Sequence, residues 1–220
     1  SVDNDLTMKR YSTYFKVATT AAITSPYRTN VIQRPNAPGA ASLIMGRSSE
    51  CYGCPHRYFR PMFTTPEPVT LVRTTSDDPA FRNLVDRLDQ DLATRNGESN
   101  AFFAQFNKVD HIQHVVVLMS GDQPIGCGAF KPFATDTVEL KRMFTAPERR
   151  QQGVGTMVLS ELERWAGELG YRHCVLETGK KMTEAIALYS KHGFTLIPNY
   201  GPYAGVEDSV CFAKRLDLGS

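Results

Sequence analysis

This 220-residue chain lacks any hydrophobic run of the ~18–20 residues that a helix needs to cross a membrane, so we expect no membrane partner. It also lacks a large excess of charge: 25 Lys and Arg residues stand against 23 Asp and Glu residues. Proteins that bind nucleic acid carry strongly basic patches. The net charge of +2 therefore argues against nucleic acid as a partner.

Cysteine is scarce and odd in number, which does not suit a disulfide framework. The five residues are Cys51, Cys54, Cys127, Cys174 and Cys211. The last three lie in apolar segments that we predict as strands. Buried thiols of this kind are typical of a reducing compartment, so we expect a cytoplasmic location.

Acidic residues are absent from Lys9 to Ser49, where basic residues are mixed with Ser, Thr, Ala, Asn and Pro. This composition resembles an organelle transit peptide that begins near Met8. The alternative is an accessory extension over residues 1–68, and we favour the extension. Tyr14–Ala18 and Ser42–Met45 could add short strands to it.

The segment Cys51-Tyr-Gly-Cys54-Pro-His56 has the spacing of metal ligands. A closed zinc site needs four ligands, and a second Cys/His pair does not follow nearby. A redox Cys-x-x-Cys normally opens a helix, which Pro55 does not favour. We therefore expect no metal site and keep a metal or redox role as the alternative. The proline-rich stretch Pro61–Pro68 then reads as a linker.

Residues 69–220 show a regular α/β pattern and are expected to form one domain. The predicted strands are Val69–Arg73, His114–Met119, Pro124–Phe130, Thr137–Thr145, Arg172–Glu177, Phe194–Ile197 and Ser209–Lys214. One helix should begin at Asp77-Asp78-Pro79 and end at Asn96-Gly97. The other predicted helices are Ala101–Phe106, the amphipathic stretch from Val154 to Leu169, and Thr183–Lys191.

The most informative stretch is residues 138–156, in which a strand, a charged turn and a helix follow one another. The turn carries Arg150-Gln-Gln-Gly153-Val-Gly155. Free N–H groups and the positive end of a helix dipole favour an anion at such a place. The pattern lacks the Gly-Lys-Ser/Thr of a Walker motif and has two of the three glycines of a dinucleotide fingerprint. We therefore predict a site for a phosphate-bearing cofactor.

Three motifs and a hairpin carry a family resemblance over residues 69–216. The motifs are Glu139-Leu-Lys-Arg-Met-Phe-Thr145, Arg150-Gln-Gln-Gly153-Val-Gly155 and Ala185-Ile-Ala-Leu-Tyr189-Ser-Lys-His-Gly193-Phe194. The glycine-bearing hairpin before Thr137 is the fourth feature. Together they resemble the GNAT superfamily of acetyl-CoA-dependent N-acetyltransferases.

The resemblance implies a mixed, mostly antiparallel α/β sheet that is flanked by helices and splayed between its fourth and fifth strands. Residues 1–68 have no counterpart in it. The pantetheine arm of acetyl-CoA is expected to lie in the splay, along the backbone of Met143, Phe144 and Thr145. The pyrophosphate is expected on the backbone of Arg150, Gln151, Gln152, Gly153, Val154, Gly155 and Thr156.

The implied reaction is direct attack of a primary amine on the thioester. The resemblance gives Tyr189 the role of protonating the leaving thiolate and gives Glu139 the role of general base. Glu177 and a chain of water molecules are the alternatives for the base. Met182 stands where many members have Asn, so that contact with the cofactor should be absent or made differently.

The acceptor pocket is expected between residues 89–106, the hairpin and the loop Tyr200–Gly205. Tyr200 and Tyr203 could border an aromatic slot there. We favour a small-molecule amine as the acceptor. A protein or peptide acetyltransferase and a non-catalytic acyl-CoA sensor remain alternatives, and a homodimer is a possible assembly.

Overall fold

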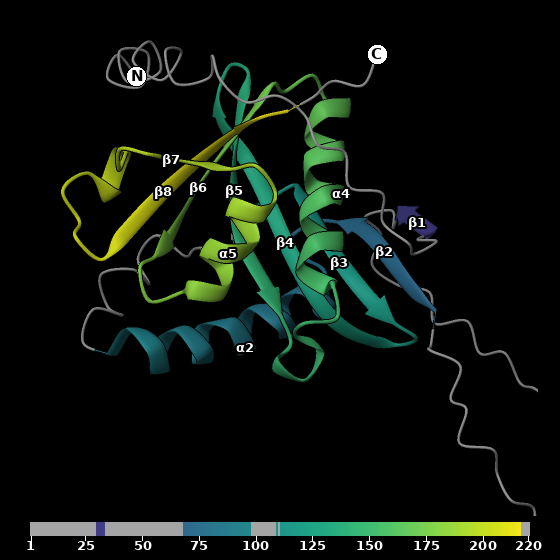
Figure 1. The fold of residues 1–220 in the computed structure, drawn as a ribbon. Helices are drawn as coiled ribbons and strands as arrows, with labels where there is room; N and C mark the ends of the chain where they lie inside the picture. The colour runs from purple at the N-terminus through teal and green to yellow at the C-terminus, as the bar shows by residue number, and fades with distance from the viewer. Residues whose placement is uncertain (1–29, 34–67, 98–108, 110, 217–220) are drawn as a thin grey trace, which may run out of the picture.

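The computed structural model describes residues 30–33, 68–97, 109 and 111–216, and for residues 30–33 it describes the backbone alone (Figure 1). Its strands are β1 (Asn30–Gln33), β2 (Val69–Thr74), β3 (His114–Ser120), β4 (Gln123–Ala134), β5 (Thr137–Thr145), β6 (His173–Gly179), β7 (Thr195–Ile197) and β8 (Ser209–Arg215). Its helices are α2 (Pro79–Asn96), α4 (Val154–Glu168) and α5 (Thr183–Lys191), with 3₁₀ turns η3 (Pro147–Arg149) and η4 (Gly201–Tyr203).

All these strands form one sheet in the order β1-β2-β3-β4-β5-β6-β8-β7. Neighbours from β2 to β5 run antiparallel, as do β6, β8 and β7. The parallel contacts are β1 with β2 and β5 with β6. The sheet is therefore mixed and mostly antiparallel, and the predicted fold class is confirmed.

One strand comes from the N-terminal extension, at a position where the sequence pattern predicted none. β1 pairs in parallel with β2, from Asn30 beside Thr70 to Gln33 beside Arg73. Four residues are too few for a periodicity to be recognised. The extension therefore contributes to the same sheet as the domain. The expected pieces at 14–18, 42–45, 51–56 and 101–106 lie outside the described residues.

The sheet opens between β5 and β6. Their shared register runs from Thr137 beside His173 to Glu139 beside Val175. Beyond this point both strands continue, β5 to Thr145 and β6 to Gly179, and they diverge. Parallel strands that separate in this way leave backbone N–H and C=O groups facing a gap. The splay between the fourth and fifth strands of the domain is where we predicted it.

Alternation along the strands divides the core into two layers, one on each face of the sheet. Val116 and Leu118 of β3 point to the face covered by α4 and α5. Val115 and Val117 point to the opposite face, which α2 covers. Figure 1 shows α4 and α5 lying over the strands, with α2 at another side of the sheet. Any gap in the sheet therefore connects the α4/α5 face with the α2 face.

Helix α2 forms as its sequence predicts. The Asp78 side chain caps it by accepting a hydrogen bond of 2.8 Å from the Ala80 N–H. Pro79 occupies the first turn, and Gly97 ends the helix with φ of 56°. The buried side chains of the helix are Phe81, Leu84, Val85 and Leu88. This stripe fixes α2 against the sheet close to the splay.

Helix α4 packs closely on the hairpin because β4 carries glycine. A Cβ built on Gly128 would lie 2.4 Å from Met143 Sδ and 2.7 Å from a Leu162 methyl carbon. Such distances are far below van der Waals contact, so a side chain at this position would push the helix away. The small residues of the hairpin therefore position α4 and, with it, the turn that precedes α4.

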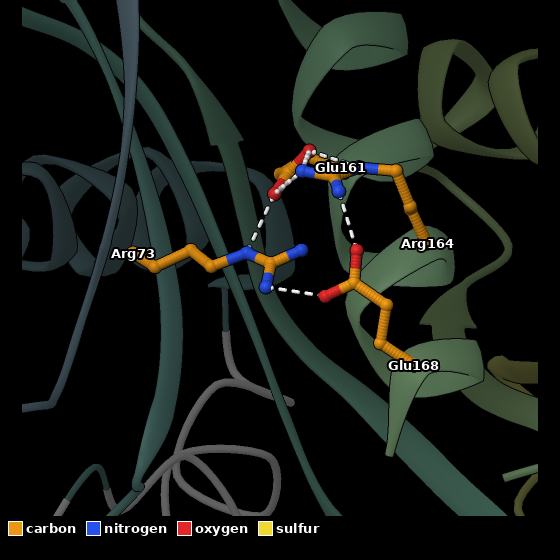
Figure 2. A network of polar contacts seen from close by, with 4 residues as sticks. All are labelled: Arg73, Glu161, Arg164 and Glu168. Carbon is orange, nitrogen blue, oxygen red and sulfur yellow. Dashed lines mark hydrogen bonds and ion pairs between the residues drawn. The ribbon is translucent and has the colours of Figure 1, made fainter. Parts of the chain in front are cut away.

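The far end of α4 is joined to β2 by a network of charged side chains (Figure 2). Arg73 donates from Nε to Glu161 at 2.7 Å and from Nη1 to Glu168 at 2.6 Å. Arg164 contacts both glutamates. The guanidinium of Arg73 also lies 4.8 Å from the ring centre of Trp165. Because Arg73 and Glu161 are both buried, this network fixes the angle at which α4 crosses the sheet.

The three described cysteines are free and buried, as the sequence predicted. Cys127 lies in β4, Cys174 in β6 and Cys211 in β8. Burial raises the pKa of the Cys127 thiol to about 12. A thiol with such a pKa is a poor nucleophile at neutral pH, so these cysteines act as core residues.

Candidate active site

A cavity of about 690 Å³ lies at the splay between β5 and β6. Its lining comes from both faces of the sheet. The α4/α5 side contributes Gly153, Val154, Gly155, Thr156, Leu188 and Tyr189, and the α2 side contributes Leu88, Leu92, Lys141, Arg142, Glu177 and Tyr203. Two molecules that approach from opposite faces can therefore meet inside the sheet.

The glycine turn forms one end of this cavity. α4 begins at Val154, and among the described residues it has no side-chain cap. Its first hydrogen bond runs from Met157 N to Gly153 O. The N–H groups of the preceding first turn therefore have no partner within the helix. Gly153 has φ of 81°, and a Cβ there would meet nothing within 4 Å, so the space beside the turn is open.

Two of the residues predicted on this turn behave differently from the others. Gln152 lies outside the described lining, and its side-chain amide donates to the Glu148 carbonyl at 3.2 Å. Arg150 lines the cavity, but its Nη2 donates to Asp91 on α2 at 3.1 Å. Backbone N–H groups would therefore provide most of the contacts to an anion at this turn, which stays a prediction.

The predicted pantetheine strand, Met143 to Thr145, also lines the cavity. β4 pairs with it on one edge, from Gly126 beside Thr145 to Cys127 beside Phe144. The other edge faces the gap. Alternate backbone groups of a strand point to opposite edges, so this stretch presents N–H donors to the cavity.

A β-bulge precedes this stretch. Cys127 pairs with Phe144 and Ala129 with Lys141, so Gly128 alone stands opposite both Arg142 and Met143. Arg142 takes φ of 57°, a left-handed conformation that is uncommon for residues other than glycine. Bulges redirect side chains and occur often beside active sites. This conformation could not be predicted from the sequence pattern.

Tyr189 lies in the cavity wall on the α4/α5 side. Its side chain is 5% exposed and packs edge-on against Phe194, with ring centres 5.7 Å apart. Burial, together with the charge of Glu177, raises the pKa of the Tyr189 hydroxyl well above its usual value. The phenol is therefore neutral at physiological pH and can donate a proton.

Two carboxylates lie near the gap, and the structure places them differently. Glu139 is buried outside the described lining of the cavity, where it accepts from Tyr200 Oη at 3.0 Å and lies 2.9 Å from Lys141 Nζ. Glu177 lines the cavity and accepts from Ser209 Oγ at 2.6 Å. Burial raises the pKa of Glu177, which makes its carboxylate a stronger base.

The two tyrosines of the C-terminal loop are both buried. Tyr200 lies behind the cavity against Phe133, with ring centres 5.1 Å apart. Tyr203 reaches the lining and accepts a hydrogen bond of 2.9 Å from Lys141 Nζ. Tyr203 therefore borders the cavity as expected, whereas Tyr200 supports Glu139.

Comparison with known proteins places this geometry in a family. Residues 77–194 match the model of the acetyltransferase (GNAT) family. A protein of Azospirillum brasilense named IAA acetyltransferase is 35% identical over 154 residues, which cover 67% of this chain and 98% of that protein.

The chain belongs to the GNAT acetyltransferase family.

Solved structures agree with this assignment. A protein of Klebsiella pneumoniae described as an acyl-CoA N-acyltransferase is 25% identical, with a TM-score of 0.57 over 68% of this chain and 98% of that one. An N-acetyltransferase from Thermoplasma acidophilum, solved with coenzyme A, is 16% identical with a TM-score of 0.51 over 67% and 98% of the two chains. The second likeness concerns the fold alone.

Acetyl-CoA is the co-substrate of GNAT acetyltransferases, and this chain is an acetyltransferase of that family. The residues present fit the cofactor. The turn before α4 offers uncapped amides and open space for a phosphate, and the edge of β5 offers donors for an extended arm. The cavity has the volume typical of small-molecule sites, ~300–1,000 Å³.

Two cations that line the cavity, Lys141 and Arg142, are not among the site residues expected from the sequence alone. Lys141 could have been found, because it stands two residues after Glu139 and therefore on the same face of β5. Arg142 could not, since regular alternation puts it on the opposite face.

Within the described residues, none of the helices has the length and apolar composition of a membrane span. In that same part of the GNAT chain, His, Cys, Asp and Glu side chains do not gather into a group of three or more that could hold a metal ion. Cys51, Cys54 and His56 lie outside it.

Proposed function

We propose that this chain transfers the acetyl group of acetyl-CoA to the primary amine of a small molecule by direct attack. The observation that carries the proposal is the cavity through the sheet. It joins a carboxylate on the α2 side, Glu177, to a buried phenol on the α4/α5 side, Tyr189. A base and an acid on opposite sides of one gap suit a reaction in which a proton is removed from one molecule and supplied to the other.

Acetyl-CoA supplies an electrophilic thioester carbonyl. Glu177 takes a proton from the ammonium group of the acceptor, and its raised pKa helps it to do so. The N–H donors of residues 143–145 stabilise negative charge on the carbonyl oxygen. As the C–S bond breaks, the Tyr189 hydroxyl donates its proton to the leaving sulfur, and the second proton lost by the acceptor nitrogen restores the hydroxyl. The turn at 150–156 holds the pyrophosphate with backbone amides.

We assign the base to Glu177 in preference to Glu139, which the sequence favoured. The Glu139 carboxylate is occupied by Tyr200 and Lys141 and lies behind the described lining. Glu139 can still act indirectly, because Lys141 joins it to Tyr203 at the edge of the cavity. Replacing each glutamate in turn and measuring activity distinguishes which of the two is the base.

The deciding experiment is a screen of acceptor amines in which release of free coenzyme A thiol is followed at saturating acetyl-CoA. We expect turnover with at least one small amine and a rise in melting temperature with acetyl-CoA alone. A thermal shift without turnover across small amines and peptides would favour a non-catalytic sensor. Turnover with peptides alone would replace the small-molecule acceptor by a protein or peptide.

A further inference from the structure

Arg142 is the one described residue of the cavity lining whose charged side chain is both buried and incompletely bonded. Its side chain is 3% exposed, and its Nη2 donates to Asp89 Oδ1 at 2.7 Å. Nε and Nη1 are buried and have no hydrogen-bond partner. These two nitrogens carry three N–H groups, and the chemistry described above uses none of them.

Buried donors without partners are rare, because water cannot replace the missing bonds. The cost is greater for a charged donor than for a neutral one. A guanidinium that keeps three N–H groups unbonded therefore points to an acceptor atom that the protein itself does not provide. Arginine is especially suited to carboxylate groups, whose oxygens match its planar set of donors.

The position of Arg142 indicates which of the two substrates would provide this hydrogen-bond acceptor. The bulge turns Arg142 toward α2, where Asp89 holds it, and thus toward the face that also bears Lys141 and Glu177. The glycine turn that suits the pyrophosphate lies on the opposite face. Arg142 therefore stands on the side from which the acceptor approaches.

The contacts of Arg142 allow it to reach an anion in the cavity. Among the described residues, its side chain makes one hydrogen bond to the protein, from Nη2 to Asp89, and the Asp89 side chain is 53% exposed. Because Nε and Nη1 are covered, contact with an anion in the cavity requires rotation of the side-chain torsions, with the bond to Asp89 kept or exchanged. The positive φ of the residue, a strained conformation, shows that its placement is maintained against a local cost.

The charges nearby favour an anion with one negative charge. Lys141 and Arg142 are balanced by Glu139 and Asp89, with which they form ion pairs of 2.9 and 2.7 Å. Glu177 adds a further carboxylate on the same face. A doubly charged phosphate would meet repulsion from these groups, whereas a single carboxylate would meet less.

We propose that Arg142 binds a carboxylate of the acceptor, so that the substrates of this enzyme are amines that also carry a carboxylate, such as amino acids. The inference rests on the proposed function. The carboxylate lies on the β5 side at Arg142 and the amine on the β6 side at Glu177. Arg142 is thus a residue that determines specificity.

The test compares L-amino acids with their primary amides, which keep the amine and the side chain but lack the negative charge. Thiol release is measured at saturating acetyl-CoA for the full-length protein and for Arg142→Gln. We expect kcat/KM at least tenfold higher for the acids in the wild type. Arg142→Gln should lower kcat/KM tenfold to a hundredfold for the acids and less than threefold for the amides.

Two further variants distinguish a specific effect of Arg142 from a general loss of structure. Arg142→Lys keeps the charge without the planar donors and should restore part of the preference. Arg82→Gln removes an exposed arginine that pairs with Asp77 and should leave the ratio of acids to amides unchanged. Misfolding would lower both substrate series together, so the ratio itself reports on Arg142.

An acid-to-amide ratio that Arg142→Gln does not alter would overturn the inference, as would faster turnover of amides or of aminoalkyl phosphates. If neither series reacts, calorimetry of the same amino acids on the CoA-saturated protein decides, and absence of Arg142-dependent binding overturns it equally. The proposed function fails by a different result, which is no thermal shift with acetyl-CoA and no thiol release with any amine.

Discussion

At the scale of single residues, the proposed chemistry depends most clearly on Tyr189. Its position was readable from the sequence because it lies in a motif that covers a whole helix and the turn after it. Its state was not. The buried environment that keeps the phenol neutral comes from Phe194 and from Phe212 of β8, which are brought together only in the fold.

Replacing Tyr189 by Phe removes the proposed acid and keeps the ring. We expect kcat to fall at least tenfold, with little change in the affinity for acetyl-CoA, because packing against Phe194 is preserved. Steady-state kinetics and calorimetry with CoA measure the two quantities. A variant with full kcat would show that the thiolate leaves without help from this residue.

The two glutamates can be separated by pH. A base must be deprotonated, so kcat/KM should fall as the pH drops through the raised pKa of Glu177, with the acidic limb above the usual value for a glutamate. Glu177→Gln should lower kcat/KM about 10²-fold or more and remove that limb. Glu139→Gln is the matched control and should retain the limb, since it alters a carboxylate outside the cavity. The opposite pattern would return the base to Glu139.

At the scale of elements, the important contact is the one between β2 and the end of α4. The sequence predicted both elements but not their connection. Arg73 and Glu161 are 88 residues apart, and nothing in either local pattern identifies the partner. The connection matters for the proposed function because the turn that we expect to bind the pyrophosphate lies at the other end of α4.

Arg73→Met should destabilise the protein by about 2–4 kcal/mol, because the buried Glu161 loses a partner and keeps only Arg164. Urea unfolding at neutral pH measures the change. Arg82→Met is the control, since its ion pair with Asp77 is exposed and should contribute at most about 1 kcal/mol. Equal losses in the two variants would contradict a special role of the network.

The same network has a predictable response to acid. The hydrogen bond from Arg73 lowers the pKa of Glu168. A carboxylate whose pKa is lower in the folded state stabilises the fold above its unfolded pKa, and this stabilisation is lost as the pH falls through the folded value. The difference in stability between wild type and Arg73→Met should therefore shrink below pH ~4.5. A constant difference down to pH ~2 would rule out this linkage.

For the whole molecule, the main question is how the N-terminal extension relates to the site. β1 covers the edge of β2, whereas the cavity lies between β5 and β6, three strands further into the sheet. Removal of residues 1–68 should therefore leave the affinity for acetyl-CoA within about twofold. It should also expose the β2 edge and increase self-association, because unpaired edge strands attract other strands.

Calorimetry with CoA and sedimentation of the truncated chain test both parts of this prediction. Loss of CoA binding would show that the extension reaches the site. A truncated chain that stays as monodisperse as the full-length protein would show that β2 is protected by other means.

The sequence by itself determined the family, the cofactor and the succession of strands and helices, because these depend on local patterns: apolar periodicity, a cap at Asp78, a glycine turn and a motif around Tyr189. Only the tertiary structure decided which carboxylate faces the cavity, which cations accompany it, and where α4 is anchored. These facts depend on contacts between residues far apart in the chain and on a bulge that puts Arg142 on an unexpected face. A prediction from periodicity assumes a regular backbone. One extra residue in β5 therefore made the position of Arg142, the side chain that we propose selects the acceptor, unpredictable from the sequence.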